Sequence, residues 1–160
     1  MVDYKQTDVG LIPNDWEVKK LGEVGGTYGG LSGKSKKDFE DGNYPYIPFM
    51  NIMSNPIIDK NYVDFVNIKK GEIHNKALKG DLFFNGSSET PEEVGMCSIL
   101  MNDIPNLYLN SFCFGFRFYK TTNENGLFFV YYFRSNEGRK HFRLLAQGAT
   151  RYNLSKTQLL

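Results

Sequence analysis

The stretch GDLFFNGSSETPEEVGMCSIL, residues 80–100, has the pattern of a strand, a polar loop and a second strand. Leu82, Phe83 and Phe84 are strand formers, residues 94–100 are mostly apolar, and residues 85–93 combine turn formers with Ser, Thr and Glu. We predict a hairpin that holds this polar loop out from a sheet. The loop offers hydrogen-bonding side chains but no His, Cys or paired-carboxylate cluster, so it favours recognition over catalysis.

The composition indicates a single, sheet-rich domain. The chain has 160 residues, which is enough to bury a real core, and 15% of them are aromatic. Aromatic residues prefer strand positions, so helix should be the minority. Residues 107–119, LYLNSFCFGFRFY, give the clearest strand, because Phe112, Phe114, Phe116 and Phe118 alternate with smaller or polar residues.

The charge is informative through its distribution. The formal net charge is only +1, so the whole chain does not carry the excess of positive charge typical of a nucleic-acid binder. Basic residues nevertheless gather in three groups: Lys34, Lys36 and Lys37; Lys69, Lys70, Lys76 and Lys79; and Arg134, Arg139, Lys140, Arg143 and Arg151. Acidic residues gather separately, within residues 38–41 and 89–93.

Cysteine use and hydropathy favour a cytoplasmic protein with no membrane segment. Cys97 and Cys113 lie among apolar residues, and no signal peptide precedes them, so we expect both thiols to be reduced and in the core. The longest apolar run, residues 127–133, is too short to span a bilayer.

The two ends of the chain differ in pattern. Residues 1–10 are polar and are expected to be a flexible N-terminus, and the alternation after them predicts a half-buried strand with Trp16 in the core. Near the C-terminus, cap residues predict helices over residues 126–134 and from Ser135 through Leu145, with Gly148 after them. Residues 151–160 are expected to start a further helix that the chain end cuts off.

Several short stretches match known catalytic or binding motifs only in part. Gly33-Lys34-Ser35 resembles the end of a phosphate loop, but Tyr28 stands where that motif needs glycine. The segment is either a Gly- and Lys-rich loop suited to phosphate contacts or a solvated surface loop. Residues 43–46, NYPY, lack the first proline of the Asn-Pro-Pro-Tyr element of amino-methyltransferases, and no cofactor glycine loop precedes them. The two histidines stand in separate elements, so we predict no metal and no cofactor.

Taken in order, five stretches resemble the target recognition domain of type I restriction-modification specificity subunits. They are GLIPNDWEVKKLGEV, YPYIPFMNI, the GDLFF strand with its polar loop, FFVYYFRS and GATRYNLSKTQLL. The resemblance implies an α/β domain, α+β in detail, with a twisted, mostly antiparallel or mixed sheet, DNA-reading loops and a small C-terminal helical region. It assigns residues 11–150 to the recognition domain and residues 151–160 to the start of a spacer helix.

The same resemblance implies a non-catalytic DNA-binding subunit. Each such domain reads one half of a split target in double-stranded DNA, while modification (methyltransferase) subunits and a restriction subunit carry the chemistry. A complete specificity subunit has two recognition domains, so this chain resembles a half-subunit or one excised domain. A half-subunit would be a candidate homodimer.

These expectations give a set of candidate contact residues. For base reading they are Asn85, Ser87, Ser88, Glu89, Thr90, Tyr28 and Arg151, and for phosphates they are Lys34, Lys36, Lys37, Lys76 and Lys79. We predict no catalytic residue. Glu89, Glu92 and Glu93 could instead only keep a hairpin tip solvated.

Two other classes of function remain open from the sequence. One is a small DNA methyltransferase or nuclease, or the recognition domain of one, which would need a cofactor glycine loop, an intact Asn-Pro-Pro-Tyr element or a metal triad. The other is a domain that binds protein or carbohydrate through its aromatic faces, which leaves the lysine groups unexplained.

Overall fold

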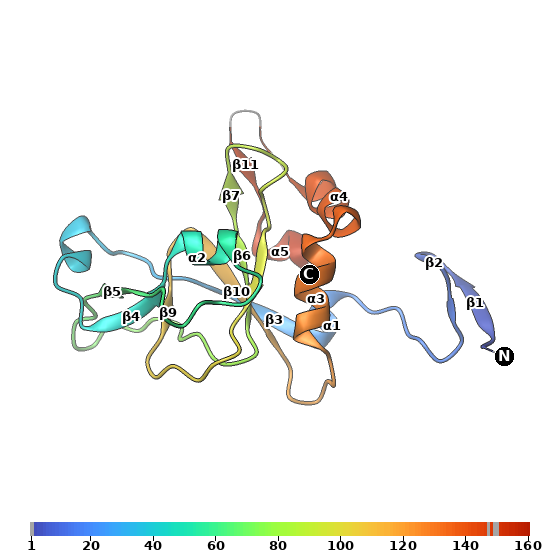
Figure 1. Cartoon of the computed structure of the whole chain (residues 1–160), viewed down its shortest axis with the longest axis horizontal. Helices are drawn as coiled ribbons and strands as arrows, with labels where there is room; N and C mark the ends of the chain where they lie inside the picture. Colours follow the sequence, from blue (N-terminus) through green and yellow to red (C-terminus); the bar gives the residue numbers. More distant parts are fainter. Residues whose placement is uncertain (1, 147, 149–150) are drawn as a thin grey trace.

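A four-stranded antiparallel sheet, in the order β3-β10-β6-β8, forms the centre of the computed structural model, which describes residues 2–146, 148 and 151–160 (Figure 1). Its strands are β3 (Gly25–Gly29), β10 (Cys113–Phe118), β6 (Leu82–Asn85) and β8 (Cys97–Ile99). The pairing of β6 with β8 confirms the predicted strand-loop-strand unit, because Leu82 lies opposite Ile99 and Phe84 lies opposite Cys97.

Both faces of this sheet are buried. On one face, Phe84, Phe114 and Phe116 pack in a cluster with Val130 and Phe142 from two helices. On the other face, Phe83 packs in a cluster with Ile52 of a short helix, Ile58 and Leu107 of loops, and Leu109 of a short strand in a second sheet. Neighbouring side chains of a strand point to opposite faces, so the continuous run Leu82–Phe84 suits a sheet that is covered twice.

The two helices on the first face begin and end where the sequence predicts. In α3 (Gly126–Arg134), the Asn125 side chain accepts a hydrogen bond from the Phe128 amide at 3.2 Å. Ser135 follows α3 directly and caps α4 (Asn136–Leu145) by accepting from the Gly138 amide at 3.2 Å. These caps are local and satisfy amides that the helices leave free, which is why the sequence alone located them.

A smaller mixed sheet extends the molecule on the other side, in the order β5-β4-β9. It contains β5 (Asp64–Val66), β4 (Tyr44–Ile47) and β9 (Tyr108–Leu109), with β9 parallel to β4. The 3-10 helix η1 (Lys36–Phe39) lies beside β5, and α2 (Phe49–Ser54) covers the second face of the central sheet. The architecture is therefore α+β with antiparallel and mixed sheets, as predicted.

The long predicted strand over residues 107–119 is interrupted. Asn110 is buried; its side chain donates to the Ile47 carbonyl at 3.1 Å and accepts from the Phe112 amide at 2.9 Å. The chain turns there, so Phe112 leaves the alternating face and is 63% exposed, in contrast to the prediction. The partner of Asn110 is 63 residues away in the sequence, which local pattern does not reveal.

The N-terminal segment forms a separate hairpin, and the residue predicted to anchor it in the core is exposed. β1 (Tyr4–Thr7) lies within the residues predicted to be flexible and pairs with β2 (Gly10–Pro13) in an antiparallel hairpin, which Figure 1 shows separated from the sheets by an extended connection. The prediction for Trp16 was wrong: this side chain lies in the connection, 60% exposed, and no strand forms around it.

The C-terminal residues pack as part of the domain. β11 (Tyr152–Asn153) pairs with β7 (Ser87–Ser88), and Leu154 and Leu159 are buried in the cluster on the first face. The predicted further helix is present only as the four-residue α5 (Lys156–Leu159). The short α1 (Leu21–Val24) lies next to the residue that follows it, with Gly22 close to Leu160. Among the described residues, no helix is both long and apolar enough to cross a membrane.

Candidate nucleic-acid interface

A narrow two-stranded antiparallel ribbon projects from the edge of the fold beside α4. It is built from β7, β11 and the loop that follows β7, and we call residues 87–94 with Arg151 and Asn153 the tip (Figure 1). The tip brings together segments that lie far apart in the sequence: the Arg151 Nε donates to the Ser87 Oγ at 2.6 Å. Glu89, Thr90 and Arg151 are exposed, and Ser87 is half-buried. Four of the seven predicted base-reading residues therefore lie on one projecting surface.

Two predicted base-reading residues support the tip from inside. Asn85 is fully buried; its Oδ1 accepts from the Met96 amide at 2.5 Å and its Nδ2 lies 3.4 Å from the Ser87 carbonyl. Ser88 is also buried, with its Oγ donating to Glu93 at 3.1 Å. Both side chains form their hydrogen bonds with residues in or next to this loop. The prediction that they contact bases is therefore corrected: they support the loop from inside.

Tyr28, the seventh predicted base reader, belongs to a partly buried network on β3 instead of a flexible loop. Its hydroxyl donates to Asp81 at 2.5 Å, and the Arg117 guanidinium lies 4.9 Å from its ring centroid. Arg117 binds the same carboxylate in a fork, at 2.8 Å and 2.7 Å. Burial, and then the Asp81 charge, raise the pKa of Tyr28. The phenol is therefore a structural donor, and the prediction for Tyr28 is corrected.

Lys34 likewise forms its contacts inside the fold. Its side chain is only 4% exposed, and its Nζ donates to the Asn67 carbonyl at 2.6 Å and to the Glu72 carboxylate. Hydrogen bonding from Lys34 is the first cause of a lowered pKa at Glu72. The predicted phosphate contact at Lys34 is therefore corrected: the ammonium fastens two loops to each other.

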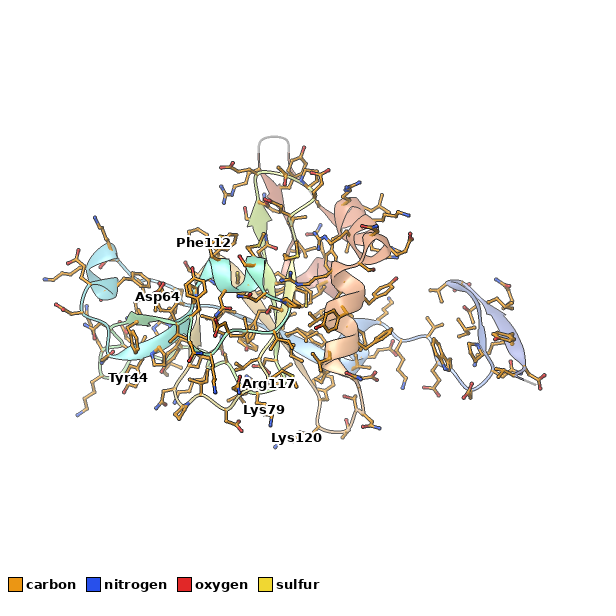
Figure 2. All side chains as sticks on the ribbon, in the orientation of Figure 1. Tyr44, Asp64, Lys79, Phe112, Arg117 and Lys120 are labelled. Carbon is orange, nitrogen blue, oxygen red and sulfur yellow. The ribbon has the colours of Figure 1, made fainter. Side chains whose placement is uncertain are left out.

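The remaining predicted phosphate residues lie on two different sides of the molecule. Lys36 and Lys37 are exposed on η1. Lys76 donates to the Asn106 side chain at 2.7 Å, and Lys79 lines a cleft of about 770 Å³ together with Arg117 and Lys120. Figure 2 shows Lys79, Arg117 and Lys120 on the side of the body away from the tip.

The arginine-rich stretch of α3 and α4 divides into internal and surface residues. Arg134 donates to the carbonyls of Cys97 at 2.5 Å and Asn55 at 2.9 Å, and Arg139 binds carbonyls of the loop at the tip. Burial lowers the pKa of both guanidinium groups. Lys140 and Arg143 stay exposed; the Arg143 Nε lies 3.5 Å from Glu92.

Lys140 and Arg143 are candidate phosphate contacts that the sequence prediction missed. The available signal was their spacing, since residues three and four apart share one face of a helix.

The described residues hold no group of three or more His, Cys, Asp or Glu side chains arranged to bind a metal. Both cysteines are free and buried, as predicted, and burial raises the pKa of each thiol. The reactive form of a cysteine is the thiolate, so neither site is set up for nucleophilic chemistry.

Comparisons with known proteins agree on one class. The curated MjaIX type I restriction enzyme specificity subunit of Methanocaldococcus jannaschii is 35% identical over 80 residues, which cover 48% of this chain and 17% of that protein. A chain from a structural study of complex assembly and conformational transition in the type I R-M system has a TM-score of 0.57 at 16% identity, covering 92% of this chain and 33% of that one. This likeness shows the fold.

The type I restriction-modification S subunit of M. genitalium is a further match, with a TM-score of 0.49 and 15% identity over 88% of this chain and 31% of that chain. The present chain thus spans about a sixth of the curated relative and about a third of the solved chains. A family model described as the type I restriction modification DNA specificity domain matches residues 13–160. This protein therefore belongs to the type I restriction modification DNA specificity domain family.

Proposed function

We propose that this chain reads the sequence of double-stranded DNA with the tip, as one recognition domain of a specificity subunit. The observation that carries this proposal is the convergence of Ser87, Glu89, Thr90 and Arg151 on one projecting two-stranded ribbon and its loop. Such a two-stranded ribbon is narrow enough to enter the major groove, where each base pair presents a distinct pattern of donors and acceptors.

The charges on the tip favour base contacts over phosphate contacts. Glu89, Glu92 and Glu93 are all exposed there, and carboxylates are repelled by phosphates. A carboxylate can instead accept a hydrogen bond from the cytosine amino group, and a guanidinium such as Arg151 can donate to guanine. Attraction to the backbone would come from exposed cations: Lys140 and Arg143 on α4, beside the tip, and Lys36 and Lys37 on η1, at one end of the fold.

Membership of this family supports a non-catalytic role for the chain, with the chemical steps carried out by other subunits. On this proposal the domain reads one half of a bipartite target in the cytoplasm and directs modification and restriction subunits to it, and two copies could serve both halves if the chain acts as a half-subunit. The comparisons give no support to a methyltransferase or nuclease acting alone. Calorimetry of the purified chain with S-adenosylmethionine should accordingly show no binding.

The reading role is tested by selecting duplexes from a random pool with the purified protein, with and without modification subunits, and then measuring affinity for the selected sequence. Glu89→Gln or Arg151→Gln should cost about 1–3 kcal/mol on that sequence and leave binding to unrelated duplexes unchanged. Glu124→Gln is the matched control, because Glu124 is an exposed carboxylate beside Lys120 on the wall of the Lys79 cleft. Equal losses on all duplexes would refute base reading by the tip.

A further inference from the structure

The loop from Glu89 to Gly95 has little backbone pairing to hold its shape. β7 contributes only Ser87 and Ser88 to a ladder. Beyond it, the loop's own backbone contacts are few: the Glu93 amide lies 3.3 Å from the Thr90 carbonyl, and only at the far end does the Gly95 amide donate to the Asn85 carbonyl, at 3.0 Å. The Ser88 Oγ adds contacts to the Thr90 amide at 3.3 Å and to Glu93 at 3.1 Å. A loop held this way would sample several paths in water. Reading base edges needs a defined path, so the fold must supply support from elsewhere.

Arg139 on α4 supplies that support. Its Nη2 donates to the Glu92 carbonyl at 3.0 Å and also to the Val94 carbonyl, and its Nη1 donates to the Gly95 carbonyl at 3.1 Å. One planar group thus binds three carbonyls within four residues. A guanidinium presents its donors in a rigid fork, whereas a lysine ammonium is a single point on a flexible stem.

Phe142, one turn further along α4, holds both the arginine and the loop. The Arg139 guanidinium lies over the Phe142 ring at 5.0 Å from its centroid, and Phe142 is buried. Gly95 passes against the same ring with a φ of +69°, and a Cβ there would overlap a Phe142 ring carbon. Only glycine allows this approach in this conformation, so the loop is seated on the aromatic ring while the arginine holds its carbonyls.

We propose that Arg139 is a positioning residue for DNA reading: it fixes the path of the loop that carries Glu89 and Thr90 without touching DNA itself. This inference rests on the proposed reading role of the tip. Its physical consequence is that loss of the fork should reduce discrimination between sequences and leave the electrostatic attraction to phosphates intact, since that attraction depends on exposed cations.

The test compares Arg139→Lys, which keeps the charge but removes the fork, with Lys140→Ala on the same helix. Arg139→Lys should weaken binding to the selected duplex about tenfold or more, with unchanged binding to a scrambled duplex and an unchanged salt dependence. Lys140→Ala should weaken both duplexes together and flatten the salt dependence by about 0.9 in slope if it meets one phosphate. Arg139→Lys behaving like Lys140→Ala would make Arg139 a phosphate contact and overturn the proposal.

A second variant tests the loop path without touching the arginine. Gly95→Ala should push the loop off Phe142 and reproduce the loss of discrimination, and in both variants the amides of residues 89–95 should exchange hydrogen faster in the DNA-free protein. The proposal is refuted if hydrogen exchange speeds up only as much as the lowered melting temperature requires and the variants still discriminate between DNA sequences below that temperature. Arg139 would then be a purely structural residue. Failure of the reading role is seen separately, as wild-type protein that binds every duplex alike.

Discussion

At the scale of single residues, the two buried thiols couple stability to alkaline pH. Burial raises the pKa of Cys113 to about 12 and that of Cys97 higher, whereas an unfolded cysteine titrates near about 8.5. Above that pH the unfolded chain loses protons that the folded chain keeps, so the free energy of unfolding must fall as pH rises. The limit is about 1.4 kcal/mol per thiol for each pH unit above about 9.

This is measured by urea unfolding of the wild type and of a Cys97→Ala/Cys113→Ala double variant between pH 8 and 10. The variant should be less stable throughout, because it leaves cavities, but its stability should depend less steeply on pH. Buried tyrosines such as Tyr28 add their own decline only near and above pH 10. Identical slopes for the two proteins would show that the thiols are not the groups responsible.

For single residues, the sequence predicts which side chains are exposed better than it predicts which hydrogen-bond partners the buried ones find. Glu89, Thr90 and Arg151 are exposed as expected because they follow turn formers in a polar stretch. Lys34 and Asn85 are also polar and also stand next to a glycine, so the same signals predicted that they would be exposed. Inside the fold, however, Lys34 donates to the Asn67 carbonyl and Asn85 accepts from the Met96 amide. A buried polar group must find a partner, and that partner is fixed by tertiary structure that no local pattern encodes.

At the scale of elements, local signals were sufficient for the helices α3 and α4 and for the β6–β8 pair, and insufficient where a distant residue decides the outcome. α3 and α4 were located by cap residues within three positions of the helix starts. The strand over residues 107–119 was broken by Asn110, whose partner lies on β4, and Trp16 was misplaced because an alternating pattern says nothing about whether another element covers it. The arginine fork of Arg139 was also beyond local pattern, since it joins residues 44 to 47 positions apart.

Ser135, the corner residue between α3 and α4, provides a test of how local capping stabilises these helices. The Ser135 Oγ donates to the Tyr132 carbonyl at 2.6 Å and accepts from the Gly138 amide at 3.2 Å, so one hydroxyl serves the end of α3 and the start of α4. Ser135→Ala should lower the free energy of unfolding by about 1 kcal/mol, measured by urea denaturation. Ser135→Asp should retain most of it, because a carboxylate also caps a helix start.

Ser111→Ala is the matched control for the corner, because Ser111 is exposed and lies outside any helix. It should change stability by less than about 0.5 kcal/mol. If Ser135→Ala were equally silent, the corner would be held by the packing of Phe133 and Phe142 rather than by the hydroxyl.

At the scale of the whole molecule, the proposed reading role makes the arrangement of charge a guide to which side would face DNA. Figure 1 shows the tip projecting between η1, at one end of the fold, and α4. A duplex is stiff over a binding site of this size, so phosphates beside a groove that the tip enters must lie towards η1 and α4. Figure 2 shows Lys79, with Arg117 and Lys120, on the side of the body away from the tip, where the same duplex would not reach.

This orientation predicts opposite results for two lysine groups that the sequence alone treats alike. Lys36→Ala/Lys37→Ala should lower affinity for every duplex and flatten the slope of log affinity against log salt by about 0.9 for each phosphate that the variant no longer neutralises. Lys79→Ala removes one lysine, against two in the η1 variant, from the opposite side, and should leave affinity and slope unchanged. Titrations of one duplex at several salt concentrations measure both. A flattened slope for Lys79→Ala beside an unchanged one for the η1 variant would place the DNA on the cleft side and leave the tip facing away from it.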